Sequence, residues 1–114
     1  MNLMTMYLML IGAHSLGDYA LQSNWIAVEK GKSLYILYIH AMIWTTVVCL
    51  VSYVIGFQLG WVKILFILLV PHFIMDYFKA QSKWYPKLIG NEKVELAIDQ
   101  CFHYVQLLIW LLVR

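Results

Sequence analysis

The stretch SLYILYIHAMIWTTVVCLVSYVI, residues 33–55, decides the fold class of this chain. It is long and apolar enough to cross the hydrocarbon core of a bilayer, which takes about 20 residues of helix. It contains one histidine, His40, and no acidic or basic residue. We therefore predict a membrane-spanning helix in which His40 needs a polar partner on a neighbouring helix.

Three more apolar stretches predict helices at about residues 2–22, 60–81 and 92–113. The predicted fold is all-α, an integral membrane four-helix bundle that forms a single domain over residues 1–114. The composition agrees, because 12% of the residues are charged whereas a soluble domain has about 25%. The connection SNWIAVEKGK, residues 23–32, is a candidate for a short interfacial helix, and the connection at residues 82–91 also has an interfacial composition.

The placement of the basic residues predicts the orientation in the membrane. Most of them lie in or beside the first and third connections, and these are Lys30, Lys32, Lys79, Lys83, Lys87 and Lys93. The opposite side carries Lys63 and Arg114. The positive-inside rule then places connections one and three in the cytoplasm and both termini outside. With its lysines in connections, the net charge of +2 gives no reason to expect nucleic acid as a partner.

Histidine and aspartate recur inside the predicted helices, at a spacing of four residues. The pairs are His14/Asp18, His72/Asp76 and Asp99/His103, and His40 stands apart from them. Residues i and i+4 share one face of a helix. Counted from the predicted helix ends, all seven lie at a similar depth in the cytoplasmic half of the membrane. We therefore expect the seven side chains to converge on one site.

Imidazole and carboxylate groups in this number are suited to binding a divalent metal ion. One zinc ion takes about four such ligands, so seven donors suit either two ions or one ion with a second shell of hydrogen-bonded carboxylates. Zinc is the first candidate, and manganese and iron follow. A carboxylate that is not a ligand, Asp99 or Glu95, is a candidate general base. Gln22 and Lys79 extend the same helix faces and are candidates for binding substrate, although a lysine at this depth is also typical of a snorkelling side chain.

Two other interpretations remain open for the same residues. His/Asp chains also relay protons or metal ions in transporters, although the outer half of the predicted bundle is mostly apolar. Alternatively, buried His–Asp pairs fix the register of helices in a structural or regulatory subunit. The sequence contains no GxSxG, no phosphate-binding glycine loop and no HExxH, which sets aside a serine hydrolase or a P-loop enzyme.

Four segments carry a resemblance to a known family: HSLGDYALQSNWIA at residues 14–27, HAMIWT at 40–45, HFIMDYFK at 72–79 and DQCFHYVQ at 99–106. They resemble Domain of Unknown Function 3307, an uncharacterised family of small bacterial and phage integral membrane proteins. This resemblance covers nearly the whole chain, implies the bacterial cytoplasmic (inner) membrane, and assigns no activity. More distantly, the His-x-x-x-Asp pairs are similar in style to those of predicted membrane-bound metal-dependent hydrolases.

These observations lead to one expected function. We expect a membrane-embedded, metal-dependent hydrolase that acts on a lipid or isoprenoid phosphate from the cytoplasmic leaflet. The expected partners are membrane lipid and such a phosphate substrate. A second copy of the chain is a further candidate partner, because so small a bundle exposes much of its surface.

Overall fold

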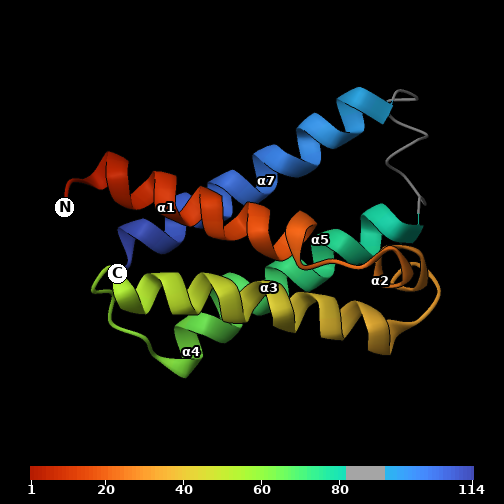
Figure 1. Ribbon diagram of the computed structural model, residues 1–114, viewed down its shortest axis with the longest axis horizontal. Coiled ribbons are helices and arrows are strands. Elements are labelled where there is room, and N and C mark those ends of the chain that lie inside the picture. The colour runs from red at the N-terminus through yellow and green to blue at the C-terminus, as the bar shows by residue number, and fades with distance from the viewer. Residues whose placement is uncertain (82–91) are drawn as a thin grey trace.

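The computed structural model describes residues 1–81 and 92–114, and in these residues every regular element is a helix (Figure 1). The elements are α1 (Leu3–Ser15), η1 (Leu16–Ala20), α2 (Asn24–Glu29), α3 (Leu34–Val54), α4 (Trp61–Lys63), η2 (Ile64–Leu69), α5 (Val70–Gln81) and α7 (Glu92–Leu112). The all-α prediction is therefore confirmed. The predicted short helix in the first connection forms as α2, whereas the predicted interfacial connection at residues 82–91 lies outside the described residues.

Two of the four long helices contain π-helical turns. The π-helical segment η1 continues α1 directly, and η2 joins α4 to α5. In η1 the amide of Leu21 donates to the carbonyl of Leu16, five residues back, at 2.9 Å. The sequence predicted unbroken helices here, at 2–22 and 60–81. Such π-helical turns often occur at functional sites, and both lie next to a His/Asp pair.

Polar side chains cap the starts of three helices. Asn2 Oδ1 accepts from the amide of Thr5 at 2.8 Å. The hydroxyls of Ser23 and Ser33 accept in the same way from amides three residues later, at 3.1 and 3.4 Å. These bonds satisfy amides that have no partner within the helix. They explain why α2 and α3 begin where they do.

The long helices pack as a ring, in which α1 contacts α3 and α7, and α5 contacts the same two helices. Both chain ends lie at one end of the bundle and α2 lies at the other (Figure 1). Along each helix the chain-end half supplies an apolar core, made of Leu10, Val48, Leu68, Leu107 and Trp110 with their neighbours. The half nearer α2 supplies the buried histidines and aspartates.

Within residues 1–81 and 92–114, two helices are long and apolar enough to cross a membrane, at Leu34–Val54 and Trp61–Lys79, whereas the sequence predicted four such helices. A shorter apolar helix covers Leu96–Leu112. The molecule measures 41 × 27 × 24 Å along its principal axes. Its long dimension is thus comparable to a bilayer with its headgroups, about 40–45 Å.

Gly17 allows η1 to approach α3 closely. A Cβ atom at this position would lie 2.9 Å from both Cα and Cδ1 of Trp44. Distances this short are not tolerated, so a larger residue would push the two helices apart. Asp18 follows directly and reaches His40 on α3. Gly17 therefore also sets the distance between η1 and α3 at the buried histidines and aspartates.

We predict that Gly17→Ala lowers the free energy of unfolding by about 1–3 kcal/mol, the usual cost of overpacking a close contact. Gly12→Ala is the matched control, because a Cβ atom at Gly12 meets nothing within 4 Å. Thermal unfolding of the two variants in the same detergent makes the comparison. Equal melting temperatures would contradict the assigned contact.

Candidate metal centre

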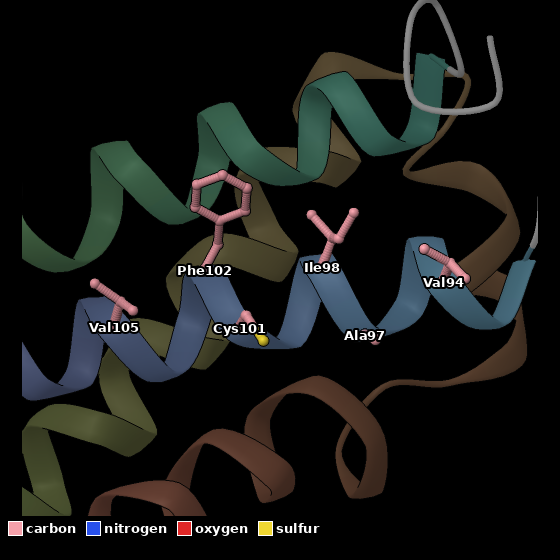
Figure 2. Close-up of a pocket in the computed structure, with 6 residues that line it drawn as sticks. All are labelled: Val94, Ala97, Ile98, Cys101, Phe102 and Val105. Carbon is pink, nitrogen blue, oxygen red and sulfur yellow. The ribbon is translucent and has the colours of Figure 1, made fainter. Parts of the chain in front are cut away.

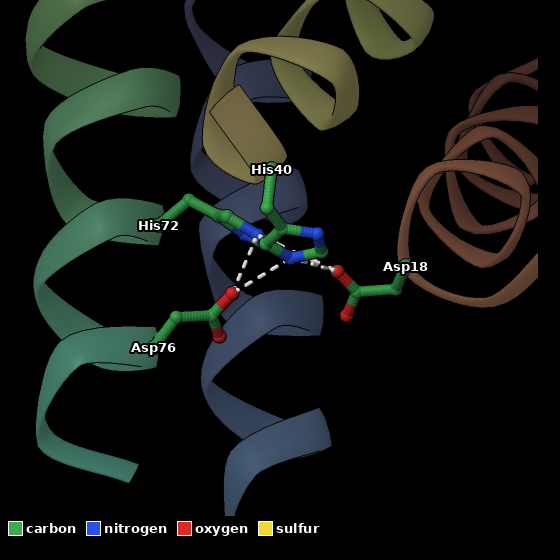
Figure 3. Close-up of side chains that lie close together, drawn as sticks. All are labelled: Asp18, His40, His72 and Asp76. Carbon is green, nitrogen blue, oxygen red and sulfur yellow. Dashed lines mark hydrogen bonds and ion pairs between the residues drawn. The ribbon is translucent and has the colours of Figure 1, made fainter. Parts of the chain in front are cut away.

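Four of the predicted ligands, from three different helices, meet at one buried point (Figure 3). Asp18 Oδ1 lies 3.3 Å from His40 Nε2 and 3.4 Å from His72 Nε2. Asp76 Oδ2 lies 2.9 and 3.1 Å from the same two nitrogens. The two nitrogens are themselves 3.4 Å apart. We call Asp18, His40, His72 and Asp76 the four-ligand group.

Three of these five separations match the edges of a coordination tetrahedron, and the two that involve Asp76 Oδ2, at 2.9 and 3.1 Å, are slightly shorter. Zinc binds imidazole nitrogen at about 2.0–2.1 Å and carboxylate oxygen at about 2.0–2.2 Å, which places tetrahedral ligands roughly 3.3–3.5 Å apart. Five of the six edges of the four-ligand group are the distances given above, and all four ligand atoms lie within 4.8 Å of one another. A cation of this size therefore fits between them without a large movement of the side chains.

The hydrogen bonding of the group is incomplete without a cation. Asp18 Oδ1 and Asp76 Oδ2 are buried and have no hydrogen-bond partner among the described residues. Asp76 Oδ2 is close to two ring nitrogens, yet neither N–H is aligned to donate to it. Buried polar atoms in native proteins normally have partners. Ligand atoms that surround a common point, instead of pointing at one another, are the geometry that a metal site requires.

A second set of donors shares Asp76 with the first. Asp76 Oδ1 lies 3.6 Å from His103 Nε2, and Asp99 Oδ1 lies 3.4 Å from the same nitrogen. We call Asp76, Asp99 and His103 the three-ligand group. Its potential ligand atoms also lie within 4.8 Å of one another and all three residues are buried.

His14 lies beside these groups, with both ring nitrogens already engaged. The indole N–H of Trp44 donates to His14 Nδ1 at 2.9 Å. His14 Nε2 must then carry the proton, and it donates to Gln100 Oε1 at 2.8 Å. His14 Nε2 is 3.8 Å from Asp18 Oδ2, so this histidine contacts the site through hydrogen bonds rather than through a free lone pair.

Trp44 and Gln100 were not among the predicted site residues. The fully buried Trp44 also stacks on the ring of His72, with 4.1 Å between centroids and 12° between planes. Its position four residues after His40 places it on the same face of α3. A buried indole N–H needs an acceptor. This requirement is the one signal in the sequence that could have identified Trp44 as a hydrogen-bond donor to a buried histidine.

Pro71 and Gln106 orient the ring of His103. Pro71 has no N–H to donate to the carbonyl of Ile67, four residues back. The side-chain amide of Gln106 donates to this carbonyl and to that of Leu68, each at 2.8 Å. Its oxygen therefore faces His103 Nδ1 at 3.3 Å, so Nδ1 is the protonated nitrogen. In a neutral ring, His103 Nε2 then has a lone pair that points toward the carboxylates of Asp76 and Asp99.

The remaining predicted site residues lie at the edge of the cluster. Lys79 Nζ contacts Asp99 Oδ2 at 3.0 Å, and its side chain is 41% exposed. Gln22 Oε1 accepts from Lys30 Nζ at 2.9 Å. The side chain of Glu95 lies outside the described residues.

A cleft of about 410 Å³ opens beside the cluster at the α2 end of the bundle. Its lining includes Gln22, Lys30, Asp76 and Lys79. Asp76 belongs to both ligand groups, so the cleft reaches the site directly. A cleft with two lysines at its mouth attracts anions.

We predict that Trp44→Phe lowers the free energy of unfolding by about 1–3 kcal/mol, because the buried His14 Nδ1 loses its donor and the smaller ring leaves space. The control is Trp61→Phe, since Trp61 is 75% exposed and substitutions at such positions stay within about 0.5 kcal/mol. Chemical denaturation of both variants provides the test. A Trp44→Phe variant as stable as Trp61→Phe would argue against this network.

The comparisons with known proteins give one match. The model of the family described as Protein of unknown function (DUF3307) matches residues 5–113. No curated protein and no solved structure matches the chain. The matched range covers almost the whole sequence and contains both ligand groups. The chain is therefore a member of the DUF3307 family of proteins of unknown function.

Proposed function

We propose that this protein is a membrane-embedded, divalent-metal-dependent hydrolase that acts on a lipid or isoprenoid phosphate. The observation that carries the proposal is the four-ligand group, in which two imidazoles and two carboxylates surround one buried point with nitrogens and oxygens 2.9–3.4 Å apart. Two nitrogen and two oxygen donors suit zinc first, and manganese or iron next. The group lies in a helical bundle, a common setting for such centres.

The distribution of side chains supports a membrane location. The seven histidines and aspartates of the cluster are each at most 9% exposed. The outer surface instead carries large apolar side chains, and Leu50, Phe66 and Leu112 are each more than 60% exposed. One part of it is a purely apolar groove on α7, lined by Val94, Ala97, Ile98, Cys101, Phe102 and Val105 (Figure 2). Apolar surface of this extent is typical of a protein in contact with lipid. We infer a multi-pass bundle of the bacterial inner membrane with both termini outside.

The chemistry follows from the donors and the cleft. A divalent ion in the four-ligand group would take water or a phosphoryl oxygen as a fifth ligand, and would then lower the pKa of that water or polarise that oxygen. Asp99 is the candidate general base whose side chain is described, since its Oδ1 has no hydrogen-bond partner in the described part of the chain. Lys30 and Lys79 would bind the phosphate oxygens at the mouth of the cleft, and Gln22 holds Lys30 in place. Hydrolysis would transfer the water oxygen to phosphorus, and the alcohol would leave with a proton.

The apolar core in the chain-end half of the bundle is an argument for hydrolysis over transport. Beyond the cluster lie the fully buried Leu10, Val48, Leu68 and Leu107, which offer no ligand for an ion in transit. The cleft that reaches Asp76 lies at the α2 end, since Ala27 and Val28 of α2 line it. A cleft at that end is sufficient for a reaction, whereas an alternating pathway needs access from both sides.

Metal content tests the first part of the proposal. We predict that protein purified in detergent binds at least one equivalent of zinc, and that His72→Ala binds far less than one. His14→Ala is the control of equal burial. It should keep a full equivalent, because the His14 nitrogens are engaged with Trp44 and Gln100. Elemental analysis after dialysis gives the result, and equal metal content in His72→Ala and wild type would contradict the assignment.

Phosphate release from a lipid phosphate in mixed micelles tests the second part. We predict metal-dependent release by wild type and none by Asp76→Asn. Lys30→Met should raise KM about fivefold, corresponding to the roughly 1 kcal/mol that a lysine contributes near an anionic surface. Lys63→Met should not change KM, since Lys63 bonds to the carbonyl of Val113 near the chain ends. Ion flux into liposomes that disappears in Asp76→Asn, without phosphate release, would support a transporter instead.

A further inference from the structure

The carboxylate of Asp76 belongs to both ligand groups through different oxygens. Its Oδ2 faces His40 and His72, and its Oδ1 faces His103. A carboxylate shared in this way is the usual bridge between two metal ions in helical bundles. The three-ligand group of Asp76, Asp99 and His103 is therefore placed to hold an ion of its own.

Two buried atoms of the three-ligand group lack a hydrogen-bond partner among the described residues. They are Asp99 Oδ1 and His103 Nε2, which lie 3.4 Å apart without an aligned hydrogen bond. Because Gln106 accepts the proton of Nδ1, Nε2 of the neutral ring that a metal ion requires directs a lone pair toward carboxylate oxygens that also carry lone pairs. A cation between these atoms would convert a repulsive arrangement into coordination.

The two groups differ in how complete they are. The four-ligand group can fill a tetrahedral ion by itself, as closed sites do, whereas three protein ligands leave a position open, as in catalytic sites. The open position would be close to the cleft, because Asp76 and Lys79 line the cleft and Lys79 contacts Asp99. An anion bound in the cleft is thus near enough to complete the coordination.

The buried charges indicate when a second ion can bind. With neutral histidines, the three aspartates and the ammonium of Lys79 leave the cluster with two negative charges. One divalent ion neutralises them, and a second would leave two uncompensated positive charges in a buried site, which is costly. An anionic ligand that binds with the second ion would remove this cost.

We propose that Asp76, Asp99 and His103 bind a second divalent ion, and that this ion binds together with a phosphate group in the cleft. The inference rests on the proposed function for the first ion and for the phosphate substrate. In the two-ion state Asp99 would be a ligand rather than a base. The second ion would lower the pKa of a bound water molecule, and the proton of that water would pass to solvent in the cleft. Phosphate would then act both as substrate and as the ligand that assembles the reactive centre.

Manganese titration tests this directly, because electron paramagnetic resonance counts bound ions and reports whether two of them are magnetically coupled. Purified protein in detergent is titrated with Mn²⁺, with and without inorganic phosphate. Wild type should bind one equivalent without phosphate and two with it, and the two-ion form should give a coupled spectrum. His103→Ala should bind one equivalent in both conditions. His14→Ala, the control, should behave as wild type.

Gln106→Leu separates positioning from folding. It removes the acceptor of His103 Nδ1 and should weaken the second ion about 10- to 100-fold without changing the affinity of the first. Circular dichroism establishes that each variant is folded.

The possible failures are distinguishable. One equivalent in wild type under both conditions, or two without phosphate, would overturn the second-ion inference while leaving the first ion in place. Two equivalents in folded His103→Ala would also overturn it. Absence of any tightly bound ion in wild type would overturn the proposed function itself.

Discussion

Three buried carboxylates face one another inside an apolar bundle, and this electrostatic constraint governs the rest of the structure. Asp18, Asp76 and Asp99 are at most 9% exposed. Isolated carboxylates in such surroundings cost several kcal/mol each, so they require positive charge close by. Lys79 supplies one charge at the edge, to Asp99. The divalent ion proposed among His40, His72, Asp18 and Asp76 would supply the remainder, and it would account for the 2.9–3.4 Å separations of their nitrogens and oxygens.

The surrounding residues hold this arrangement in place. Gly17 lets η1 come close enough to α3 for Asp18 to reach His40. Trp44 fixes the tautomer of His14 and the ring plane of His72. Gln106, bonded to the carbonyl that Pro71 leaves free, fixes the tautomer of His103. Each contact comes from a different helix, so the site and the helix packing stabilise each other.

Much of this organisation can be predicted from the sequence, because spacing of four residues places each His/Asp pair on one helix face and apolar length gives the helices. The division of the histidines and aspartates into the four-ligand group and the three-ligand group cannot be predicted in this way. Which ligands share a point depends on the axial offset between helices, and that is set by contacts such as Gly17 with Trp44. His14 has the same spacing to Asp18 as His72 has to Asp76. The indole N–H of Trp44 on α3, however, donates to His14 Nδ1. The π-helical turns also have no simple sequence signal apart from Pro71.

The measurement that tests this account most directly is anomalous diffraction at the absorption edge of the bound metal, in crystals of the detergent-purified protein. The account predicts a peak about 2.0–2.2 Å from Nε2 of His40 and His72, Oδ1 of Asp18 and Oδ2 of Asp76. Those four side chains paired by aligned hydrogen bonds, with no anomalous peak between them, would contradict it.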